Sequence, residues 1–227
     1  VIFISGHFNN FELLAMSIEK SGIDLAAIYR PLNNMFLNKT MEKKIINKIV
    51  KPTLLALKKR GNPYQGFLYV GLMIKDNNPY LIEFNVRMGD PECQTILPRL
   101  KTDLVKIIFS TVTNKLAKIK IKWKKCKSMA VVLCSNGYPG NYRINQEITN
   151  LDKLKLKKNN FIYHAGTKYE ANKLLSNGGR VLNIISTGKN FLVIRKKIIK
   201  LIKQINWKFG FYRKDIGWKV IDKNEDY

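Results

Sequence analysis

The feature that most constrains the fold is a pair of strand-like runs joined by a turn, at residues 66–74 and 80–85. The residues between them, Lys75-Asp-Asn-Asn-Pro79, are of types that favour turns. We therefore expect the two runs to pair as a β-hairpin.

Helices and further strands are expected around this hairpin. Apolar residues recur with helical spacing at residues 40–59, where Pro52 interrupts the pattern. Residues 118–126 alternate Lys with other residues and predict an edge strand with one charged face. The other expected elements are helices at residues 92–97, 103–116 and 191–205, and strands at residues 128–134, 161–164, 173–175 and 180–186. The predicted class is mixed, α/β (α+β).

The second strand of the hairpin ends in a carboxylate and an amide. Glu83 and Asn85 are two residues apart, so in a strand both side chains lie on one face, with Phe84 on the other. Mg²⁺ prefers oxygen ligands and is usually held by one or two protein groups together with phosphate oxygens. The pair is a candidate metal site, and an ordinary solvated strand end is the alternative.

The residues after this strand strengthen the metal-site interpretation. Arg87 offers a planar fork for phosphate or carboxylate, and Gly89 permits close backbone approach. Asp90-Pro91-Glu92 then places carboxylates just before a predicted helix. These types suit the binding of a metal-bridged phosphate.

The formal charge of +25 is the main compositional signal. Clustered Lys and Arg would indicate nucleic-acid binding, because they neutralise phosphates. Here Lys is scattered along the whole chain together with Asn and Ile, as an A- and T-rich coding sequence would produce. We interpret the charge as a solvated surface and expect no specific nucleic acid, with a basic nucleic-acid-binding module as the remaining alternative.

Cysteine usage and hydropathy suggest a cytoplasmic protein. Cys93, Cys126 and Cys134 are odd in number and show no CxxC spacing, so neither a disulfide framework nor a zinc site is predicted. No apolar run approaches the roughly 18 residues that cross a bilayer, so no membrane span is expected. The start, Val1-Ile-Phe-Ile-Ser, fits a cut inside a strand better than a signal peptide.

Several motifs in order resemble the C-terminal half of the glycinamide ribonucleotide synthetase (phosphoribosylamine–glycine ligase) family. The resemblance runs from about residue 43 to about residue 220. It is carried by residues 49–53, Leu81-Ile-Glu-Phe-Asn-Val-Arg-Met-Gly-Asp-Pro-Glu92 and residues 97–101, then Asn136-Gly-Tyr-Pro-Gly140, His164-Ala-Gly-Thr-Lys168, Asn177-Gly-Gly-Arg-Val181 and residues 211–218. It implies the C-terminal half of an ATP-grasp fold followed by a small β-rich C-terminal domain.

The resemblance also implies a reaction and its site residues. The family joins glycine to 5-phosphoribosylamine in purine synthesis, using ATP and Mg²⁺ (or Mn²⁺) to form glycyl phosphate. Carried over by position, Glu83 and Asn85 are the metal ligands, and Arg87 and Asp90 lie beside the acyl phosphate and the substrates.

A second set of residues is implied for the ribose 5-phosphate. Lys168 and Arg180 would supply charge, while Gly178 and Gly179 would let the backbone approach. The alternative is two tight turns with surface cations. His164, on an apolar strand, is expected to be packed and hydrogen-bonded rather than to act as a base.

The first forty-odd residues indicate a different fold and a different family. Residues 1–5 and 23–29 predict strands and residues 8–20 a helix, which together form a βαβ unit. His7 and Glu12 lie at the strand-to-helix turn, where an acid can orient a basic histidine. With Tyr29-Arg-Pro31, this segment resembles the start of the lipid A lauroyl/myristoyl acyltransferases, whose donor is an acyl carrier protein. The resemblance implies that Arg30 contacts a phosphate. A helix cap or solvated role is the alternative for His7 and Glu12.

The two resemblances meet within residues 38–44 without a flexible linker. We therefore expect an acyltransferase-like fragment at residues 1–42, an ATP-grasp portion at 43–119 and the synthetase C-terminal domain at 120–227. Both partners would be truncated, which favours a composite of two gene fragments over a bifunctional enzyme. Because the nucleotide-gripping half of the ATP-grasp fold has no counterpart here, this chain alone is predicted not to make the product.

Overall fold

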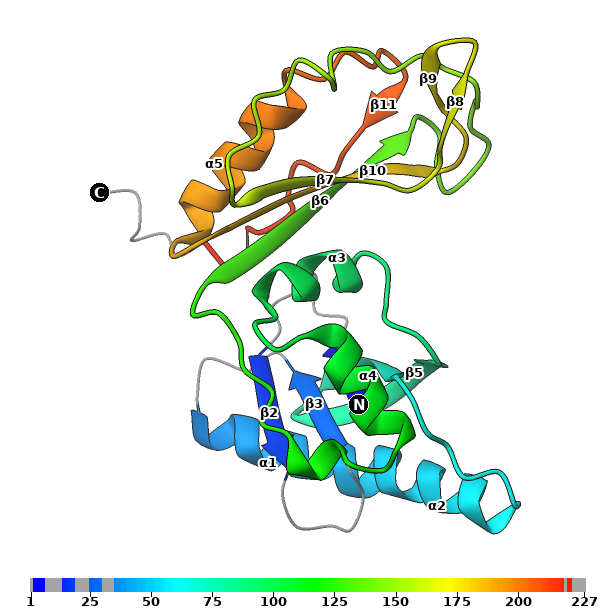
Figure 1. Ribbon diagram of the computed structural model, residues 1–227, viewed down its shortest axis with the longest axis vertical. Coiled ribbons are helices and arrows are strands. Elements are labelled where there is room, and N and C mark those ends of the chain that lie inside the picture. Colours follow the sequence, from blue (N-terminus) through cyan, green and yellow to red (C-terminus); the bar gives the residue numbers. More distant parts are fainter. Residues whose placement is uncertain (1, 7–13, 19–24, 30–34, 219, 222–227) are drawn as a thin grey trace. The chain divides into compact units, whose positions relative to one another are not determined.

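The structure, a computed structural model, describes residues 2–6, 14–18, 25–29, 35–218 and 220–221 (Figure 1). The chain divides into two compact units. Unit 1 is Val1–Asp90 with Leu100–Lys124, and unit 2 is Pro91–Arg99 with Lys125–Tyr227. Each unit has its own sheet, and the mixed helix and strand content agrees with the predicted class.

Unit 1 is built on a five-stranded mixed sheet. The strand order is β2-β3-β1-β4-β5. β1 is parallel to both β3 and β4, whereas β2–β3 and β4–β5 are antiparallel pairs. The bounds are β1 (Ile2–Gly6), β2 (Leu14–Ile18), β3 (Leu25–Tyr29), β4 (Leu68–Lys75) and β5 (Asn78–Asn85).

The predicted hairpin is confirmed as β4 and β5. Its two-residue turn places Asp76 and Asn77 at φ of 49° and 56°. Positive φ at both central residues is what a type I′ hairpin turn requires, and Asp and Asn tolerate it well. The register shifts between Gly71 and Leu72, so the strand pair contains an irregularity in its middle.

The prediction of a helix at residues 8–20 is wrong for residues 14–18, the part of this segment that the structure describes. Leu14–Ile18 form β2, which pairs antiparallel with β3. Leu14, Met16 and Ile18 alternate with smaller residues, and such a short apolar run satisfies either a strand or a helix period. The two expected strands are present as β1 and β3, and β1 joins the front segment to the hairpin by pairing with β4 over Ile2–Gly6.

The helix predicted at residues 40–59 is present and begins earlier. It comprises α1 (Met35–Ile45), a π-helical turn η1 (Ile46–Val50) and α2 (Lys51–Lys59). Pro52 lies in the first turn of α2, where its missing N–H is tolerated, and the wider π turn precedes it. The buried core here consists of Met41, Ile45, Ile46, Val50, Leu68, Val70 and Leu72.

The remaining helix of unit 1 is shorter than predicted. α4 (Leu104–Val112) starts at the N-cap Asp103, whose carboxylate accepts from Lys106 N at 2.8 Å. It ends before Asn114, which has a φ of 55°. A 3₁₀ turn, η3 (Leu116–Lys118), follows.

The prediction of an edge strand at residues 118–126 is wrong. Only an isolated bridge forms there, between Leu100 and Trp123. Lys101 N and Thr102 N donate to Lys122 O at 2.9 and 3.2 Å. The Lys alternation has the period of a strand, but the segment has no continuous neighbour to pair with.

Unit 2 is a four-stranded sheet with a helix on it. The order is β11-β6-β10-β7, and all its pairs are antiparallel. The bounds are α3 (Glu92–Ile96), η2 (Leu97–Arg99), β6 (Lys127–Ser135), β7 (Asn160–His164), β8 (Thr167–Glu170), β9 (Lys173–Ser176), β10 (Arg180–Gly188), α5 (Phe191–Ile202) and β11 (Gly210–Phe211). The strands and helices predicted here are confirmed, and β8, which pairs with β9, and β11, which pairs with β6, are additions.

The core of unit 2 lies between α5 and the sheet. Ile194 and Ile198 of α5 are fully buried and belong to the same cluster as Leu182 and Ile184 of β10. α5 is capped by Asn190, whose side chain accepts from Val193 N at 2.9 Å. No helix in the described part of the chain combines the length and apolar character needed to cross a membrane.

Candidate functional site

The two predicted metal ligands lie side by side at the end of β5. Asn85 Nδ2 donates to Glu83 Oε1 at 2.9 Å. This contact places both side chains on one face of the strand, as the two-residue spacing predicts. Glu83 is exposed and Asn85 is half-buried, so the pair is open to a ligand.

Gly71 makes room for the Glu83 side chain. It lies opposite Glu83 in the β4–β5 ladder, and a Cβ on Gly71 would lie 2.9 Å from Glu83 Cγ and 3.7 Å from Glu83 Oε1. Sequence reasoning did not single out Gly71. The available signal was a glycine inside a predicted strand, which often marks a close approach.

The residues after β5 form a loop at the same end of the strand. Arg87 is exposed, and its Nη1 donates to Met88 O at 2.9 Å. Asp90 is also exposed. Arg87 and Asp90 thus follow the Glu83–Asn85 pair within a few residues along the chain, and both stay predicted substrate contacts.

The oxygen donors at Glu83 and Asn85 fit a hard divalent cation that is shared with phosphate. No group of three or more His, Cys, Asp or Glu residues among those the structure describes could hold a metal ion by itself. A carboxylate and an amide oxygen are a sufficient protein contribution for Mg²⁺, which commonly keeps phosphate and water as its other ligands. The donor set therefore suits a metal that arrives with a phosphate.

In unit 2, three glycine-containing loops pack on one another at one end of the sheet. A Cβ on Gly166 would lie 2.7 Å from Arg180 O and 2.8 Å from Gly178 Cα. Gly166 N donates to Arg180 O at 2.9 Å, and Asn177 N donates to Gly166 O at 2.7 Å. The predicted motifs at residues 164–168 and 177–181 are thus one structural cluster.

The motif at residues 136–140 completes this loop cluster. A Cβ on Gly179 would lie 2.1 Å from Tyr138 Cδ2, so the glycine backbone lies against the tyrosine ring. Ser135 binds the same loop twice, because its N donates to Gly179 O at 2.8 Å and its Oγ to Gly178 O at 2.7 Å. Sequence reasoning missed Ser135 and Tyr138 as members of the cluster.

The two cations expected to bind phosphate lie on strands that border the loop cluster. Lys168 is in β8, and its Nζ lies 2.5 Å from Glu170 Oε2. Arg180 is the first residue of β10 and is exposed. Arg180 pairs with Cys134 in the β10–β6 ladder. Burial raises the pKa of the Cys134 thiol, and the positive charge of Arg180 offsets part of that rise.

His164 differs from expectation in one respect. His164 is hydrogen-bonded as expected, with Nδ1 3.0 Å from Thr167 Oγ1, but it is exposed rather than packed. It is the last residue of β7, where the strand runs into the loop cluster. His7, Glu12 and Arg30 lie outside the described residues.

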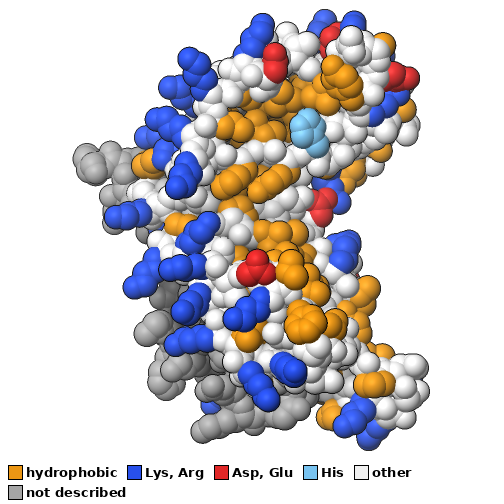
Figure 2. All heavy atoms as spheres, in the orientation of Figure 1, with side chains coloured by type: hydrophobic (Ala, Val, Ile, Leu, Met, Phe, Trp, Pro, Cys, Tyr) orange, Lys and Arg blue, Asp and Glu red, His pale blue; other side chains and the backbone are white. Residues whose placement is uncertain are grey.

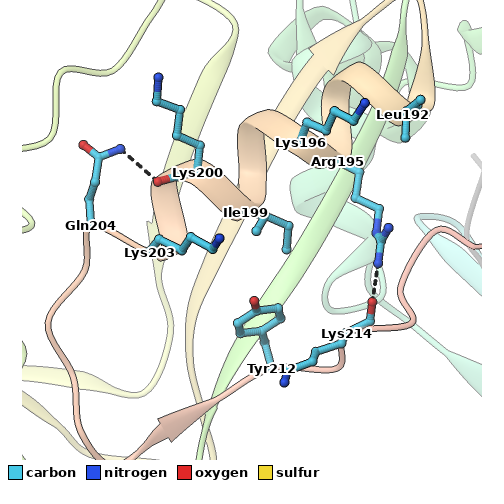
Figure 3. Close-up of a pocket in the computed structure, with 9 residues that line it drawn as sticks. All are labelled: Leu192, Arg195, Lys196, Ile199, Lys200, Lys203, Gln204, Tyr212 and Lys214. Atoms are coloured by element: carbon cyan, nitrogen blue, oxygen red, sulfur yellow. Dashed lines mark hydrogen bonds between the residues drawn. The ribbon is translucent and has the colours of Figure 1, made fainter. Parts of the chain in front are cut away.

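A separate hollow of about 780 Å³ lies along α5 (Figure 3). Arg195 donates to the backbone oxygen of Lys214, and Gln204 Nε2 donates to Lys200 O at 2.9 Å. Figure 2 shows Lys and Arg side chains along the side of unit 2 where α5 lies. The lining residues are Leu192, Arg195, Lys196, Ile199, Lys200, Lys203, Gln204, Tyr212 and Lys214, a set with five cations and no acid.

Two family profiles match the chain. The profile for the ATP-grasp (A) domain of phosphoribosylglycinamide synthetase matches residues 27–93, and the profile for the C domain of the same enzyme matches residues 128–219. Together they cover more than half of the chain and include both clusters of predicted site residues.

Curated relatives agree with these profiles. The chain is 42% identical over 184 residues to the phosphoribosylamine–glycine ligase of Caldanaerobacter subterraneus, covering 79% of this chain and 43% of the relative. It is 39% identical over 185 residues to that of Agrobacterium fabrum, with shares of 82% and 43%. The chain thus spans about two fifths of the length of the curated relatives it matches.

A solved structure supports the same relationship. The phosphoribosylamine–glycine ligase of Thermotoga maritima superposes with a TM-score of 0.65 at 30% identity, covering 83% of this chain and 45% of that one. None of these matches supports the acyltransferase resemblance of residues 1–42, and the ATP-grasp profile itself begins at residue 27. The chain belongs to the phosphoribosylamine–glycine ligase (phosphoribosylglycinamide synthetase) family, of which it carries ATP-grasp and C-domain sequence.

Proposed function

We propose that this chain supplies the metal corner and the ribose-phosphate loops of an ATP-dependent ligase that joins glycine to 5-phosphoribosylamine in purine biosynthesis. The Glu83–Asn85 contact carries this proposal. It presents two hard oxygen donors on one strand face, within sequence that matches the family's ATP-grasp domain.

The metal corner would hold Mg²⁺ or Mn²⁺ through Glu83 and Asn85. A divalent ion bound there neutralises charge on phosphate oxygens during phosphoryl transfer. Arg87 would add a guanidinium beside the phosphate, and its exposure leaves the side chain able to turn toward a ligand. Asp90 would orient the amine or the glycine from the same loop.

The loop cluster of unit 2 would hold the ribose 5-phosphate. Lys168 and Arg180 would supply positive charge, and Gly178 and Gly179, packed against Gly166 and Tyr138, would hold the loop that presents Arg180 to the phosphate. Glu170 forms an ion pair with Lys168, and a bound phosphate would compete with Glu170 for the Lys168 ammonium group. The ligand would therefore replace an ion pair rather than meet an unbound cation.

The two predicted portions of the chain would have different roles. Residues 43–119 would form the ATP-grasp portion and residues 120–227 the C domain. ATP, glycine and 5-phosphoribosylamine would meet a complete site only when the rest of the ligase is supplied. We therefore expect the isolated polypeptide to release no product when mixed with the three substrates.

The test is isothermal titration of the full chain with Mg²⁺–ATP, and with Mn²⁺–ATP in a second series. Glu83→Gln should weaken binding at least about tenfold, since it removes the charged oxygen ligand, which corresponds to roughly 1.4 kcal/mol. Asp152→Asn is the matched control, because Asp152 is an exposed acid in a turn of unit 2. Equal affinities for the two variants, or no Mg²⁺–ATP binding by the unmodified chain, would contradict the proposal.

A further inference from the structure

One face of α5 lines the hollow of Figure 3 and carries most of its positive charge. Each residue on this face lies three or four positions from another, so the set forms one stripe along the helix. Its members are Leu192, Arg195, Lys196, Ile199, Lys200 and Lys203. Different residues of α5, among them Ile194 and Ile198, pack on the sheet. The stripe therefore lies beside the core face and is open to a ligand.

The segment after β11 forms the opposite wall of the hollow. Tyr212 is half-buried and packs on the core of unit 2, which fixes its ring in this wall. Arg195 donates to the backbone oxygen of Lys214, and this contact ties the wall to the helix. Figure 3 shows the Lys203 and Lys214 side chains at the same end of the hollow as Tyr212. This end thus combines an aromatic ring with two amines.

The lysines of the hollow have no counter-charge among the described residues. The nine lining residues include five cations and no acid, and no described carboxylate forms an ion pair with any of these lysines. Asp215 is the next acid along the chain, and Arg213 binds it through Nε at 3.1 Å and Nη2 at 2.5 Å. That contact is the main cause that lowers the pKa of Asp215, and Arg195 adds a smaller effect. Like charges three or four residues apart destabilise a helix, and a bound anion would relieve their repulsion.

The size of the hollow and the spread of its cations define the class of anion. A volume of about 780 Å³ is within the range of pockets that hold small molecules. Arg195 and Lys203 are eight residues apart on α5, which corresponds to about 12 Å along the helix. A single phosphate is too small to contact cations over this length, whereas a chain of phosphates can. Leu192 and Ile199, with the Tyr212 ring, add apolar surface for an organic group.

We propose that the hollow along α5 binds a small compound that carries a chain of two or more phosphates, either inorganic or esterified to an organic group. None of the residues proposed to hold the metal or the ribose 5-phosphate lines this hollow. The site is therefore additional to the proposed ligase site. A longer polyanion would not need the opposite wall, which closes the hollow around a compact ligand.

The test is isothermal titration of the full chain with sodium tripolyphosphate, and with ATP in a second series, in buffer freed of divalent metal by a chelating resin. Lys203→Glu and, separately, Lys214→Glu should each weaken binding of both compounds at least about tenfold, because attraction to the phosphates becomes repulsion. Lys153→Glu, in an exposed turn of unit 2, makes the same change in net charge and should alter the affinity less than about twofold. Tighter binding of ATP that Tyr212→Leu removes would assign the hollow to an esterified chain, and equal binding of the two compounds to an inorganic one.

Circular dichroism of each variant establishes that it is folded before binding is measured. The proposal is overturned if neither compound binds, if both folded variants of the hollow bind as the unmodified chain does, or if Lys153→Glu loses as much affinity as they do. Loss of tripolyphosphate binding in Lys168→Gln alone would assign the phosphates to the loop cluster and also overturn it. Tighter binding of a single-stranded oligonucleotide than of ATP, lost in Lys203→Glu, would assign the hollow to nucleic acid with the same result. Because no divalent metal is present, the outcome is independent of the metal corner at Glu83.

Discussion

Gly71 lies directly opposite Glu83 in the β4–β5 ladder, and its missing side chain leaves the space in which the Glu83 side chain lies. A Cβ at residue 71 would come within 2.9 Å of Glu83 Cγ. Real Cβ atoms do not approach so closely, so one of the two side chains would have to move. The glycine therefore sets the direction in which Glu83 reaches Asn85.

Gly71→Ala should weaken Mg²⁺–ATP binding with little loss of fold. The added methyl displaces the Glu83 carboxylate from Asn85, and we expect an affinity loss of about tenfold, or roughly 1.4 kcal/mol. Titration calorimetry measures it. In a Glu83→Gln background the same substitution should have no further effect, because the group it displaces is already neutral. An additive loss in the double variant would show that Gly71 acts by another route.

Gly166→Ala should destabilise unit 2. The new Cβ would meet backbone atoms, Arg180 O at 2.7 Å and Gly178 Cα at 2.8 Å, which cannot rotate away. Overpacking of this kind lowers the free energy of unfolding by about 1–3 kcal/mol, measurable by urea denaturation. Gly61→Ala is the comparison, since a Cβ there meets nothing within 4 Å and only its φ of 77° is strained. Equal losses would mean that the loops do not pack as described.

Arg180→Gln should make Cys134 less reactive. Burial raises the pKa of the Cys134 thiol, and the Arg180 charge opposes that rise, so removing the charge raises the pKa further. The thiolate is the reactive form. The pH profile of Cys134 alkylation by iodoacetamide, read from its peptide by mass spectrometry, should shift to higher pH. Lys168→Gln should leave the profile in place, and a shift of equal size there would contradict the assigned contact.

The hairpin and the adjacency of Glu83 and Asn85 could be predicted from sequence because they depend on local rules. Turn residues at 75–79 determine the hairpin, and two-residue spacing in a strand places Glu83 and Asn85 on one face. The role of Gly71 could not be predicted without the register, since its partner is fixed only when the bulge between Gly71 and Leu72 is known.

The errors arose where pairing, rather than periodicity, decides the structure. Leu14–Ile18 suits a helix or a strand by composition, and it is a strand because β3 pairs with it. Residues 118–126 have a strand period, but only Trp123 finds a bridge partner. The loop cluster joins Gly166, Gly178 and Tyr138 from distant segments, and sequence spacing does not show which turns touch.

Lys196→Glu should stabilise the chain. Lys196 lies four residues before Lys200 on α5 and shares the hollow with Arg195, Lys203 and Lys214, so like charges face one another there. The substitution replaces a repulsive pair by an attractive one and should raise the free energy of unfolding by about 0.5–1 kcal/mol at low salt. The gain should shrink in high salt. Lys153→Glu, in an exposed turn, should produce a smaller gain, and equal gains would point to net charge alone.

Glu42→Gln should stabilise unit 1 in a pH-dependent way. Glu42 in α1 is 6% exposed, and burial raises its pKa above the ordinary 4.5. The folded chain then binds this proton more tightly than the unfolded chain, so the wild type loses stability as pH rises through the folded pKa. Gln loses none. Thermal scans should give similar melting temperatures near about pH 4 and a higher one for Glu42→Gln near about pH 8. Parallel curves for the wild type and Glu42→Gln would show that the Glu42 carboxyl group is in contact with water and not buried.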